Sequence, residues 1–287
     1  MEATDVGAAS ARPGTAVAIG NFDGVHKGHR LLVARALEAA GARSLRSVVL
    51  TFDRHPATVV RPGRTPKLLT SVEHKLELLR GTGVDEVVVL RFDEDRAAES
   101  AEDFVCTVLA GDLRARVVVV GASFRFGHGQ GGDVGLLESM GRDLGFDVAR
   151  VELVTDDLDG GTTVVSSSLV RALVAGGQLG AAASLLGRPF EVRAPLAEVR
   201  ESGAGALLRL VVPSALLAPP PGGYVGDVRQ VRGDGVALAA QVLVAGDDPV
   251  VLSVRLAAGS PGPWAGTSRP GDAFAVRFEG PSPASCR

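Results

Sequence analysis

Short apolar runs alternate with amphipathic stretches through the first two thirds of the chain. Continuous apolar runs predict buried strands at residues 16–19, 47–52, 86–90, 115–121 and 146–153. Apolar positions at helical spacing predict helices between them, and the first of these covers about residues 26–40 and ends at Gly41. Strands that are apolar throughout and alternate with helices are typical of a parallel sheet covered on both faces. The pattern therefore predicts an α/β fold with a Rossmann-like, doubly wound parallel sheet.

Two side chains in this region, those of Thr70 and Cys106, allow predictions about local structure. Thr70, with Glu73 three residues later, has the spacing of a capping box and predicts a helix that runs to Arg80. Cys106 lies within the apolar pattern of another helix, which predicts a buried free thiol. Two short helices, over residues 166–176 and 179–187, are predicted to close the α/β region.

The pattern changes near Arg188. From there the segments are short and strand-like, and they are interrupted by the turn-rich stretches 218–223, 232–235, 246–249 and 259–266. This predicts a small all-β domain without helices. The expected domains are a flexible leader at 1–13, an α/β domain at 14–187 and a β domain at 188–287.

Composition and charge exclude several classes of protein. Apolar residues make up 46% of the 287 positions, which is enough for a substantial core. The 30 basic and 33 acidic residues give a net charge of −3, so a basic nucleic-acid-binding surface is not expected. No uncharged apolar stretch reaches the length of about 18 residues that predicts a membrane helix. With only two cysteines and no secretion signal at the N-terminus, the chain is expected to be cytoplasmic.

The stretch GNFDGVHKGH, residues 20–29, directly follows the first predicted strand. Its glycines permit tight turning, and the helix that follows directs free N–H groups and the positive end of its dipole toward a ligand. His26 and His29 are three residues apart, so we expect both to project from one side of the first turn. Two imidazoles there suit the charge that develops on a phosphate during transfer. A metal site is the competing chemistry, although cysteine or carboxylate partners at ligand spacing are lacking. A plain turn with incidental histidines is the structural alternative.

Three later stretches favour the phosphate interpretation. TFDRHP (51–56) ends the second strand, VGASFRFGHGQGG (120–132) ends the fourth, and SSSLVR (166–171) opens a helix after the last strand with three hydroxyls and an arginine. Because parallel strands bring their carboxyl ends to one edge of a sheet, we expect these stretches to gather there. Together they predict a nucleotide site.

The segments GNFDGVHKGH, TFDRHP, VVGASFRFG and SSSLVR, in this order, resemble the adenylyltransferase domain of the bacterial bifunctional riboflavin kinase/FAD synthetases. The resemblance covers about residues 14–190. It implies that the FMN phosphate attacks the α-phosphorus of ATP, giving FAD and pyrophosphate, with Mg²⁺ accompanying ATP. No covalent enzyme intermediate is implied, since the second substrate supplies the nucleophile.

The resemblance also implies roles for individual residues. The catalytic residues are His26, His29 and Arg171. The nucleotide-binding residues are Gly20, Asn21, Phe22, Asp23, Gly24, His26, Gly28, His29, Gly121, Ser166, Ser167, Ser168 and Arg171. The flavin-binding residues are Phe52, His55, Pro56, Ser123, Phe124, Arg125 and Phe126. No residue is assigned to a resident metal ion.

The chain departs from the family pattern in three places. One of them, Ser168 for the threonine of the family's SST, keeps the hydroxyl donor. Ser123 stands where the family has Asn or Asp, which places contacts with the flavin or its ribityl chain in question. The C-terminal domain lacks the GFPTAN loop of the riboflavin kinases, and PVVLSVRLAAG (249–259) offers no catalytic acid. The resemblance then implies a β-barrel that retains the fold without the kinase chemistry. An unrelated β-domain is the alternative.

Three functions remain as hypotheses at this point. The first is an adenylyltransferase that makes FAD from FMN without kinase activity. The second is a nucleotidyltransferase acting on a modified flavin or another phosphate-bearing acceptor, and the third is a regulatory module that senses a flavin or a nucleotide. The expected partners are ATP and FMN or an FMN analogue, without nucleic acid or membrane, and a homo-oligomer is left open.

Overall fold

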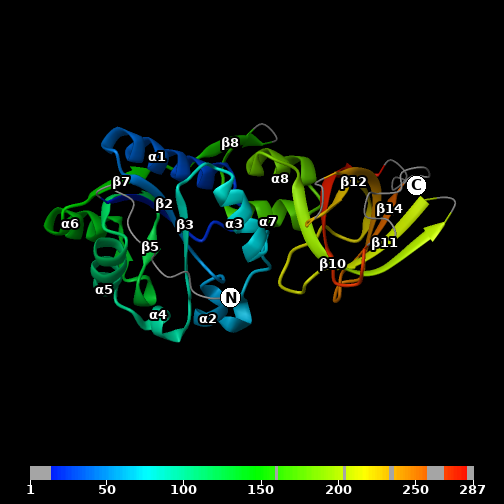
Figure 1. Cartoon of the computed structure of the whole chain (residues 1–287), viewed down its shortest axis with the longest axis horizontal. Coiled ribbons are helices and arrows are strands. Elements are labelled where there is room, and N and C mark those ends of the chain that lie inside the picture. Colours follow the sequence, from blue (N-terminus) through cyan, green and yellow to red (C-terminus); the bar gives the residue numbers. More distant parts are fainter. Residues whose placement is uncertain (1–13, 159–160, 203–204, 233–235, 257–267, 283–287) are drawn as a thin grey trace. The chain divides into compact units, whose positions relative to one another are not determined.

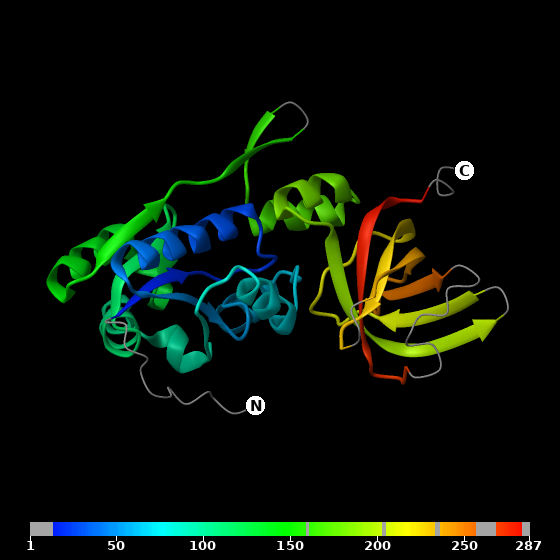
Figure 2. The ribbon, with the colours of Figure 1, turned by 45° about the horizontal axis from the view of Figure 1, so that its top comes forward.

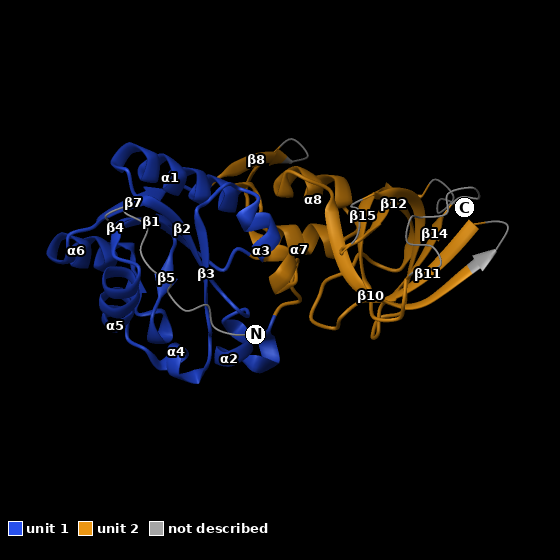
Figure 3. Ribbon diagram, in the orientation of Figure 1, with its two compact units in different colours: residues 1–22, 28–65, 76–153 blue, residues 23–27, 66–75, 154–287 orange. Residues whose placement is uncertain are grey.

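The structure is a computed structural model that describes residues 14–158, 161–202, 205–232, 236–256 and 268–282. The predicted leader at 1–13 and the turn at 259–266 lie outside these residues. The chain forms two compact units (Figure 3). Unit 1 consists of the described parts of residues 1–22, 28–65 and 76–153, and unit 2 of those of 23–27, 66–75 and 154–287.

Unit 1 is built on a five-stranded parallel sheet (Figure 1). Its strands are β1 (Thr15–Ile19), β2 (Arg46–Phe52), β3 (Glu86–Leu90), β4 (Ala115–Gly121) and β7 (Asp147–Val151). Every residue of β1 is buried, as expected for a central strand with both faces covered. In the order β3-β2-β1-β4-β7, successive strands are added on one side of β1 up to β3 and on its other side from β4 onward. The topological switch point therefore lies between β1 and β4. The predicted doubly wound α/β fold is confirmed.

The helices and short elements of the first 150 residues connect these strands. They are α1 (Lys27–Arg43), α2 (Ala57–Val60), η1 (Pro62–Arg64), α3 (Val72–Arg80), α4 (Glu94–Ala98), α5 (Ala101–Phe104), the π-helix η2 (Val105–Asp112), β5 (Arg125–Phe126), η3 (His128–Gln130), β6 (Gly132–Asp133) and α6 (Val134–Leu144). The apolar positions of η2 and α6, such as Leu109 and Leu137, form one core with Ile19, Leu50 and Val118 of the sheet.

Two local predictions in unit 1 are wrong. Helix α1 does not end at Gly41 but continues to Arg43, and a Cβ atom at Gly41 would have no other atom within 4 Å. A glycine in open space therefore weakens the helix without ending it. Cys106 is exposed, not buried. It lies on η2, where Val105, Val108 and Leu109, spaced three and four residues apart, form the buried side and leave Cys106 off it.

Unit 2 contains a β-hairpin, two helices and a closed six-stranded barrel (Figure 2). The hairpin strands are β8 (Thr155–Leu158) and β9 (Gly161–Val164), and the helices are α7 (Ser167–Ala175) and α8 (Leu179–Leu186). The barrel strands are β10 (Phe190–Ser202), β11 (Gly205–Val211), β12 (Gly222–Gln230), β13 (Leu238–Ala245), β14 (Val251–Leu256) and β15 (Ala273–Pro281). The barrel closes through antiparallel pairing of β10 with β15. The predicted barrel is therefore confirmed, whereas the hairpin was not predicted.

A single hydrophobic core joins the two helices of unit 2 to its barrel. Val174 and Leu185 from the helices share this core with Leu208, Val254 and Phe278 from the strands. The boundary predicted at residues 187/188 stays a prediction. In the part of the chain that the structure describes, no helix is long and apolar enough to span a membrane.

Two glycines within helices of unit 1 differ in the space around them, Gly41 being in open space and Gly141 in close contact with Phe146, and they provide a matched pair of substitutions. We expect Gly41→Ala to raise the free energy of unfolding by about 0.5–1 kcal/mol, because alanine favours the helix and meets no neighbour. Gly141→Ala is expected to lower it by about 1–3 kcal/mol, because the new Cβ would lie 2.6 Å from the Phe146 carbonyl oxygen. Urea unfolding of both variants measures the two changes in the free energy of unfolding. Changes of equal size and sign would contradict the open position of Gly41 and the close packing of Gly141.

Candidate active site

The carboxyl ends of β1, β2 and β4 bring together several predicted residues of unit 1. Gly20 and Asn21 follow β1, Phe52 ends β2, and Gly121 ends β4. The Gly20 N–H donates to the Leu50 carbonyl at 3.1 Å, which continues the pairing of β1 with β2. In an open parallel sheet, the edge beside a reversal of strand order is where ligands bind. These predicted residues of unit 1 thus lie at the strand ends where a ligand is expected.

The turn after β1 has an unusual backbone. Phe22, Gly24 and Val25 have φ angles of 54°, 80° and 41°. A positive φ is rare for bulky or β-branched residues, so this conformation is strained and persists only because surrounding contacts enforce it. Phe22 and Val25 are both completely buried. A Cβ atom at Gly24 would lie 2.7 Å from the Leu69 side chain. Both the positive φ angle and this close contact therefore favour glycine at position 24.

Asp23 is the centre of a buried hydrogen-bond network in unit 2. Its carboxylate accepts hydrogen bonds from the backbone N–H groups of Leu69 and Thr70 at 3.0–3.1 Å, and its Oδ2 lies 2.8 Å from Nη2 of Arg171. The Asp23 carbonyl accepts a bond from the Ser167 hydroxyl at 2.9 Å. A buried carboxylate is tolerated only when it is paired in this way. Asp23 therefore fastens the turn to residues 66–75 and to α7.

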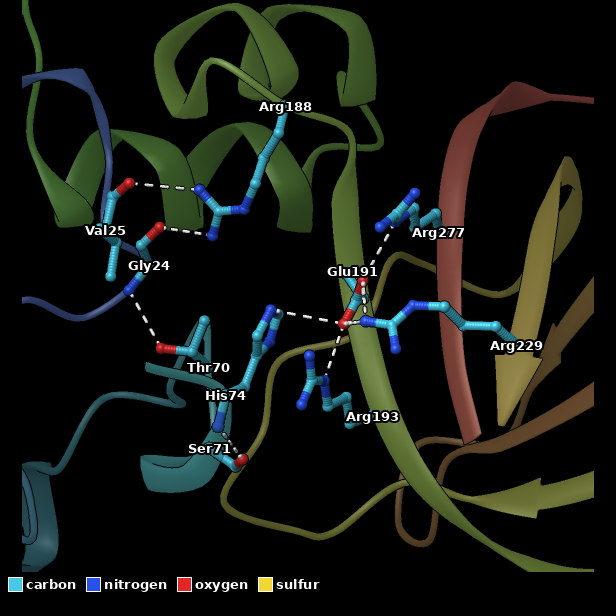
Figure 4. A network of polar contacts seen from close by, with 10 residues as sticks. All are labelled: Gly24, Val25, Thr70, Ser71, His74, Arg188, Glu191, Arg193, Arg229 and Arg277. Carbon is cyan, nitrogen blue, oxygen red and sulfur yellow. Dashed lines mark hydrogen bonds and ion pairs between the residues drawn. The ribbon is translucent and has the colours of Figure 1, made fainter. Parts of the chain in front are cut away.

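Thr70 takes part in this network instead of capping a helix as the sequence predicted. Its hydroxyl accepts a bond from the Gly24 N–H at 3.2 Å (Figure 4). The same hydroxyl donates to Asp23 at 3.3 Å. The hydroxyl of Ser71 takes over the capping role and accepts from the His74 N–H at 3.2 Å. The capping box is wrong because a partner 46 residues away occupies the Thr70 hydroxyl.

The N-terminus of α7 presents the predicted serines. Ser166 caps the helix by accepting a bond from the Leu169 N–H at 3.2 Å, Ser167 bonds to the turn, and Ser168 is exposed. Arg171 follows on the next turn of the helix. Its Nε is buried and has no hydrogen-bond partner among the residues that the structure describes.

His26 is buried immediately before α1, with 5% of its surface exposed. Burial, helped by the nearby Arg188 and Arg171, lowers the pKa of His26 to about 4 against the opposing effect of Asp23. The imidazole is therefore neutral at pH 7. The Asp23 carboxylate and the guanidinium groups of Arg188 and Arg171 therefore all act on the ring of His26.

His29 lies in the first turn of α1, as predicted. Its ring meets the ring of Phe22 edge-on, with centroids 5.1 Å apart and an interplanar angle of 61°. Phe22, predicted as nucleotide-binding, is thus a completely buried ring against which His29 packs. Gly28 occupies the preceding position of the helix and is partly exposed.

The predicted flavin-binding residues near β2 form a local structure of their own. The Phe52 ring packs edge-on against Phe92 at 5.3 Å. Nδ1 of His55 accepts a hydrogen bond from the Ala57 N–H at 3.1 Å, and Pro56 stands at the N-cap of α2. The histidine is therefore oriented by the short helix that follows it.

The predicted flavin-binding residues after β4 divide into exposed and buried positions. Ser123 and Arg125 are exposed, and Arg125 lies 3.4 Å from the Asp133 carboxylate. Phe124 stacks on Phe126 at 5.4 Å, and Phe126 is a buried member of the unit 1 core. The sequence did not assign this structural role to Phe126.

The β8–β9 hairpin supplies a contact that the sequence did not predict. The Lys27 ammonium lies 2.6 Å from Oδ2 of Asp156, and this bond lowers the pKa of the Asp156 carboxyl. Residues 155–164, TDDLDGGTTV, carry no apolar alternation that would have indicated a strand.

Comparison with known proteins identifies the family. The sequence model of the FAD synthetase family matches residues 8–168. The bifunctional riboflavin kinase/FMN adenylyltransferase of Escherichia coli (strain K12) is 38% identical over 179 residues, which are 62% of this chain and 56% of that protein. The Pseudomonas fluorescens protein of the same description is 36% identical over 179 residues, with the same coverage. The chain therefore matches little more than half the length of these curated relatives.

Two further comparisons bear on the extent of the match. A Geobacillus thermodenitrificans protein is 36% identical over 178 residues, which are 92% of that protein. A crystal structure described as a macrolide-efflux protein from Streptococcus pneumoniae aligns with a TM-score of 0.77 at 25% identity. That alignment covers 97% of this chain and 87% of the other.

The lowered pKa of His26 predicts a pH-dependent stability. Between pH 6.5, the ordinary value, and pH 4 the unfolded chain binds a proton that the folded chain does not. The free energy of unfolding should therefore fall as the pH is lowered through this window, by up to about 3 kcal/mol from this group. Urea unfolding at several pH values, compared with His26→Asn, isolates the effect. An identical pH slope in both proteins would contradict the prediction.

Proposed function

This chain belongs to the FAD synthetase family, and we propose that it transfers the adenylyl group of ATP to the phosphate of FMN. An FMN phosphate oxygen attacks the α-phosphorus of ATP, the bond to the β-phosphate oxygen breaks, and pyrophosphate leaves as FAD forms. One observation carries the proposal: the strained turn that holds the buried, neutral His26 is fastened by Asp23 to the serine-rich start of α7. Helix N-termini of this kind bind phosphates.

We assign charge stabilisation to His26, His29 and Arg171. A neutral imidazole donates a hydrogen bond to a phosphate oxygen, and the negative charge of a bound triphosphate would raise the low pKa of His26. The buried Nε of Arg171 is a further donor for a phosphate oxygen. Enzymes that transfer phosphoryl or nucleotidyl groups lower the barrier mainly in two ways. They align the two substrates, and they place fixed hydrogen-bond donors where negative charge develops in the transition state.

Binding of the two substrates is divided among the remaining residues. Gly20 to Gly24, Gly28 and Gly121 shape the nucleotide side, and Ser166, Ser167 and Ser168 bind the triphosphate. The flavin side is assigned to Phe52, His55, Pro56, Ser123, Phe124, Arg125 and Phe126, of which Phe126 acts from within the core. Ser123 reaches less far than the Asn or Asp of the family, and this favours a modified flavin as the second candidate acceptor.

Magnesium enters this proposal as part of the substrate, bound to the phosphates of ATP. The oxygens of Asp23 are occupied by backbone N–H groups and by Arg171. Within the described ranges, no group of three or more His, Cys, Asp or Glu side chains is arranged to hold an ion. The protein's own contribution is therefore to orient the phosphates and to neutralise their charge.

We further propose that the barrel, residues 188–287, has no riboflavin kinase activity, and that residues 14–187 carry the transfer reaction in the cytoplasm. The argument rests on the missing GFPTAN loop and on the lack of an acidic residue in PVVLSVRLAAG.

A turnover assay tests both parts of the proposal. Purified protein is incubated with ATP, Mg²⁺ and either FMN or riboflavin, and the flavins are separated chromatographically. We expect FAD from FMN and no product from riboflavin. FMN formed from riboflavin would contradict the loss of kinase activity, and the absence of FAD from FMN would contradict the proposed acceptor.

Substitution of the two histidines tests the assigned chemistry. We expect His26→Asn and His29→Asn each to lower kcat by about 100- to 1000-fold, as the loss of a donor to developing charge does elsewhere. His128→Asn is the matched control, because this exposed ring lies outside the proposed site and its Nδ1 is 3.1 Å from the Ala97 carbonyl. Unchanged kcat in either test variant would refute the catalytic role of that histidine.

A further inference from the structure

The outer face of the barrel carries a buried charged cluster that the proposed reaction does not use (Figure 4). Its centre is Glu191, the second residue of β10, with 6% of its surface exposed. Phe190 and Val192 on either side point into the barrel core, so Glu191 points outward. A carboxylate buried on the outside of a barrel must face another segment of the chain.

That segment is residues 66–75, through His74. Nε2 of His74 lies 3.3 Å from Oε1 of Glu191, and both side chains are about 95% buried, with 4% and 5% exposed. Three arginines from the barrel strands complete the cluster: Arg193 at 2.8 Å, Arg277 at 3.1 Å and Arg229 at 3.3 Å. Burial alone would raise the pKa of Glu191, but His74, Arg193 and Arg229 outweigh it and lower this pKa to about 2. Glu191 is therefore ionised and fully paired.

A second contact reaches the turn directly. Arg188, two residues before β10, donates from Nη2 to the Gly24 carbonyl at 2.7 Å and from Nη1 to the Val25 carbonyl at 3.2 Å. A guanidinium presents its donors in a rigid planar fork, which suits two neighbouring carbonyls. Gly24 and Val25 both have positive φ angles, and this conformation is strained for Val25, so Arg188 bonds to a strained part of the turn.

The two contacts converge on Gly24. Its carbonyl is held by Arg188, and its N–H is held by Thr70, four residues before His74. The Ser71 cap ties the start of α3 to His74, and His74 in turn bonds to Glu191. Both backbone polar groups of Gly24 are thus held by chain segments that are anchored at the beginning of the barrel.

We propose that Arg188 and Glu191 are positioning residues for the nucleotide site: Arg188 holds the turn at 23–27 directly, and Glu191 holds it through His74 and Thr70. The barrel then contributes to nucleotide binding without kinase chemistry of its own. The catalytic consequence rests on the proposed function, but the effect on the turn does not. Loosening the turn releases His26 and Asp23 from their fixed places, which weakens phosphate binding.

Hydrogen exchange of the full-length protein is the direct test. We expect Arg188→Met and Glu191→Gln to raise the exchange rate of amides in residues 20–27 by about tenfold or more, as the loss of a charge-assisted hydrogen bond would. Exchange in the barrel strands that do not contact Glu191, residues 240–244 and 252–256, should not change. Glu198→Gln is the matched control, because Glu198 lies on the same strand in an exposed pair with Arg200 at 2.7 Å.

Binding of ATP with Mg²⁺, measured by calorimetry without FMN, provides the second readout. The dissociation constant is expected to rise about tenfold in both test variants and to stay unchanged in Glu198→Gln. Because Glu191 acts through His74, the double variant Glu191→Gln/His74→Gln should be no weaker than Glu191→Gln alone. Additive losses would show that Glu191 and His74 act on the turn independently, and would contradict the proposed connection through His74.

The outcomes separate this proposal from the proposed function. Unchanged exchange in residues 20–27, or an equal rise in residues 240–244 and 252–256, overturns the positioning role whatever the activity. A local rise together with weaker ATP binding supports it, even if the wild-type protein forms no FAD and the proposed function fails. Should Glu191→Gln not fold, Arg188→Lys decides, because it keeps the charge and loses the forked contact. We expect it to exchange faster than wild type, and wild-type exchange would refute the proposal.

Discussion

The carboxylate of Asp23 is buried where the first strand gives way to the first helix, and a buried charge must be paired at every oxygen. It accepts hydrogen bonds from the backbone N–H groups of residues 69 and 70 and pairs with the guanidinium of Arg171 on α7. Three segments that are distant in sequence therefore meet because a single negative charge cannot be left without partners. The strained backbone of the turn, the burial of His26 and the place of Arg171 all depend on this pairing.

Much of the architecture follows from local pattern. Uninterrupted apolar runs such as VVVV in β4 indicate a buried parallel strand whatever surrounds them, and turn-rich segments after residue 188 indicated a β domain. One error occurred where a distant partner decides the outcome, because Thr70 bonds to Gly24 instead of capping its own helix. A partner distant in sequence leaves no trace in local periodicity. The exposure of Cys106, by contrast, fits the helical spacing of the buried residues Phe104, Val105, Val108 and Leu109.

The site was predictable to the same extent. The positions of His29, Ser166 and Gly121 follow from where strands end and helices begin, which the sequence indicates. The partners of these residues do not follow. Arg188 and Glu191 appear in the sequence as ordinary charged residues at the edge of a β domain, and nothing in their spacing relates them to residues 24 or 74. Their roles come from the way in which the barrel strand leaves α8, which only the tertiary structure reveals.

The continuous core of unit 2 limits how the α/β part of this protein can be joined to a different C-terminal domain. Val174 and Leu185 of the helices pack in the same cluster as Val254 and Phe278 of the barrel. Cutting the chain between α8 and β10 would leave these helices with an apolar face in contact with water, a surface prone to association. A chimera that joins the α/β part to a different C-terminal domain must therefore supply a complementary apolar face, or replace the helix residues with polar ones. Exchange of the two parts requires matched surfaces as well as a suitable linker.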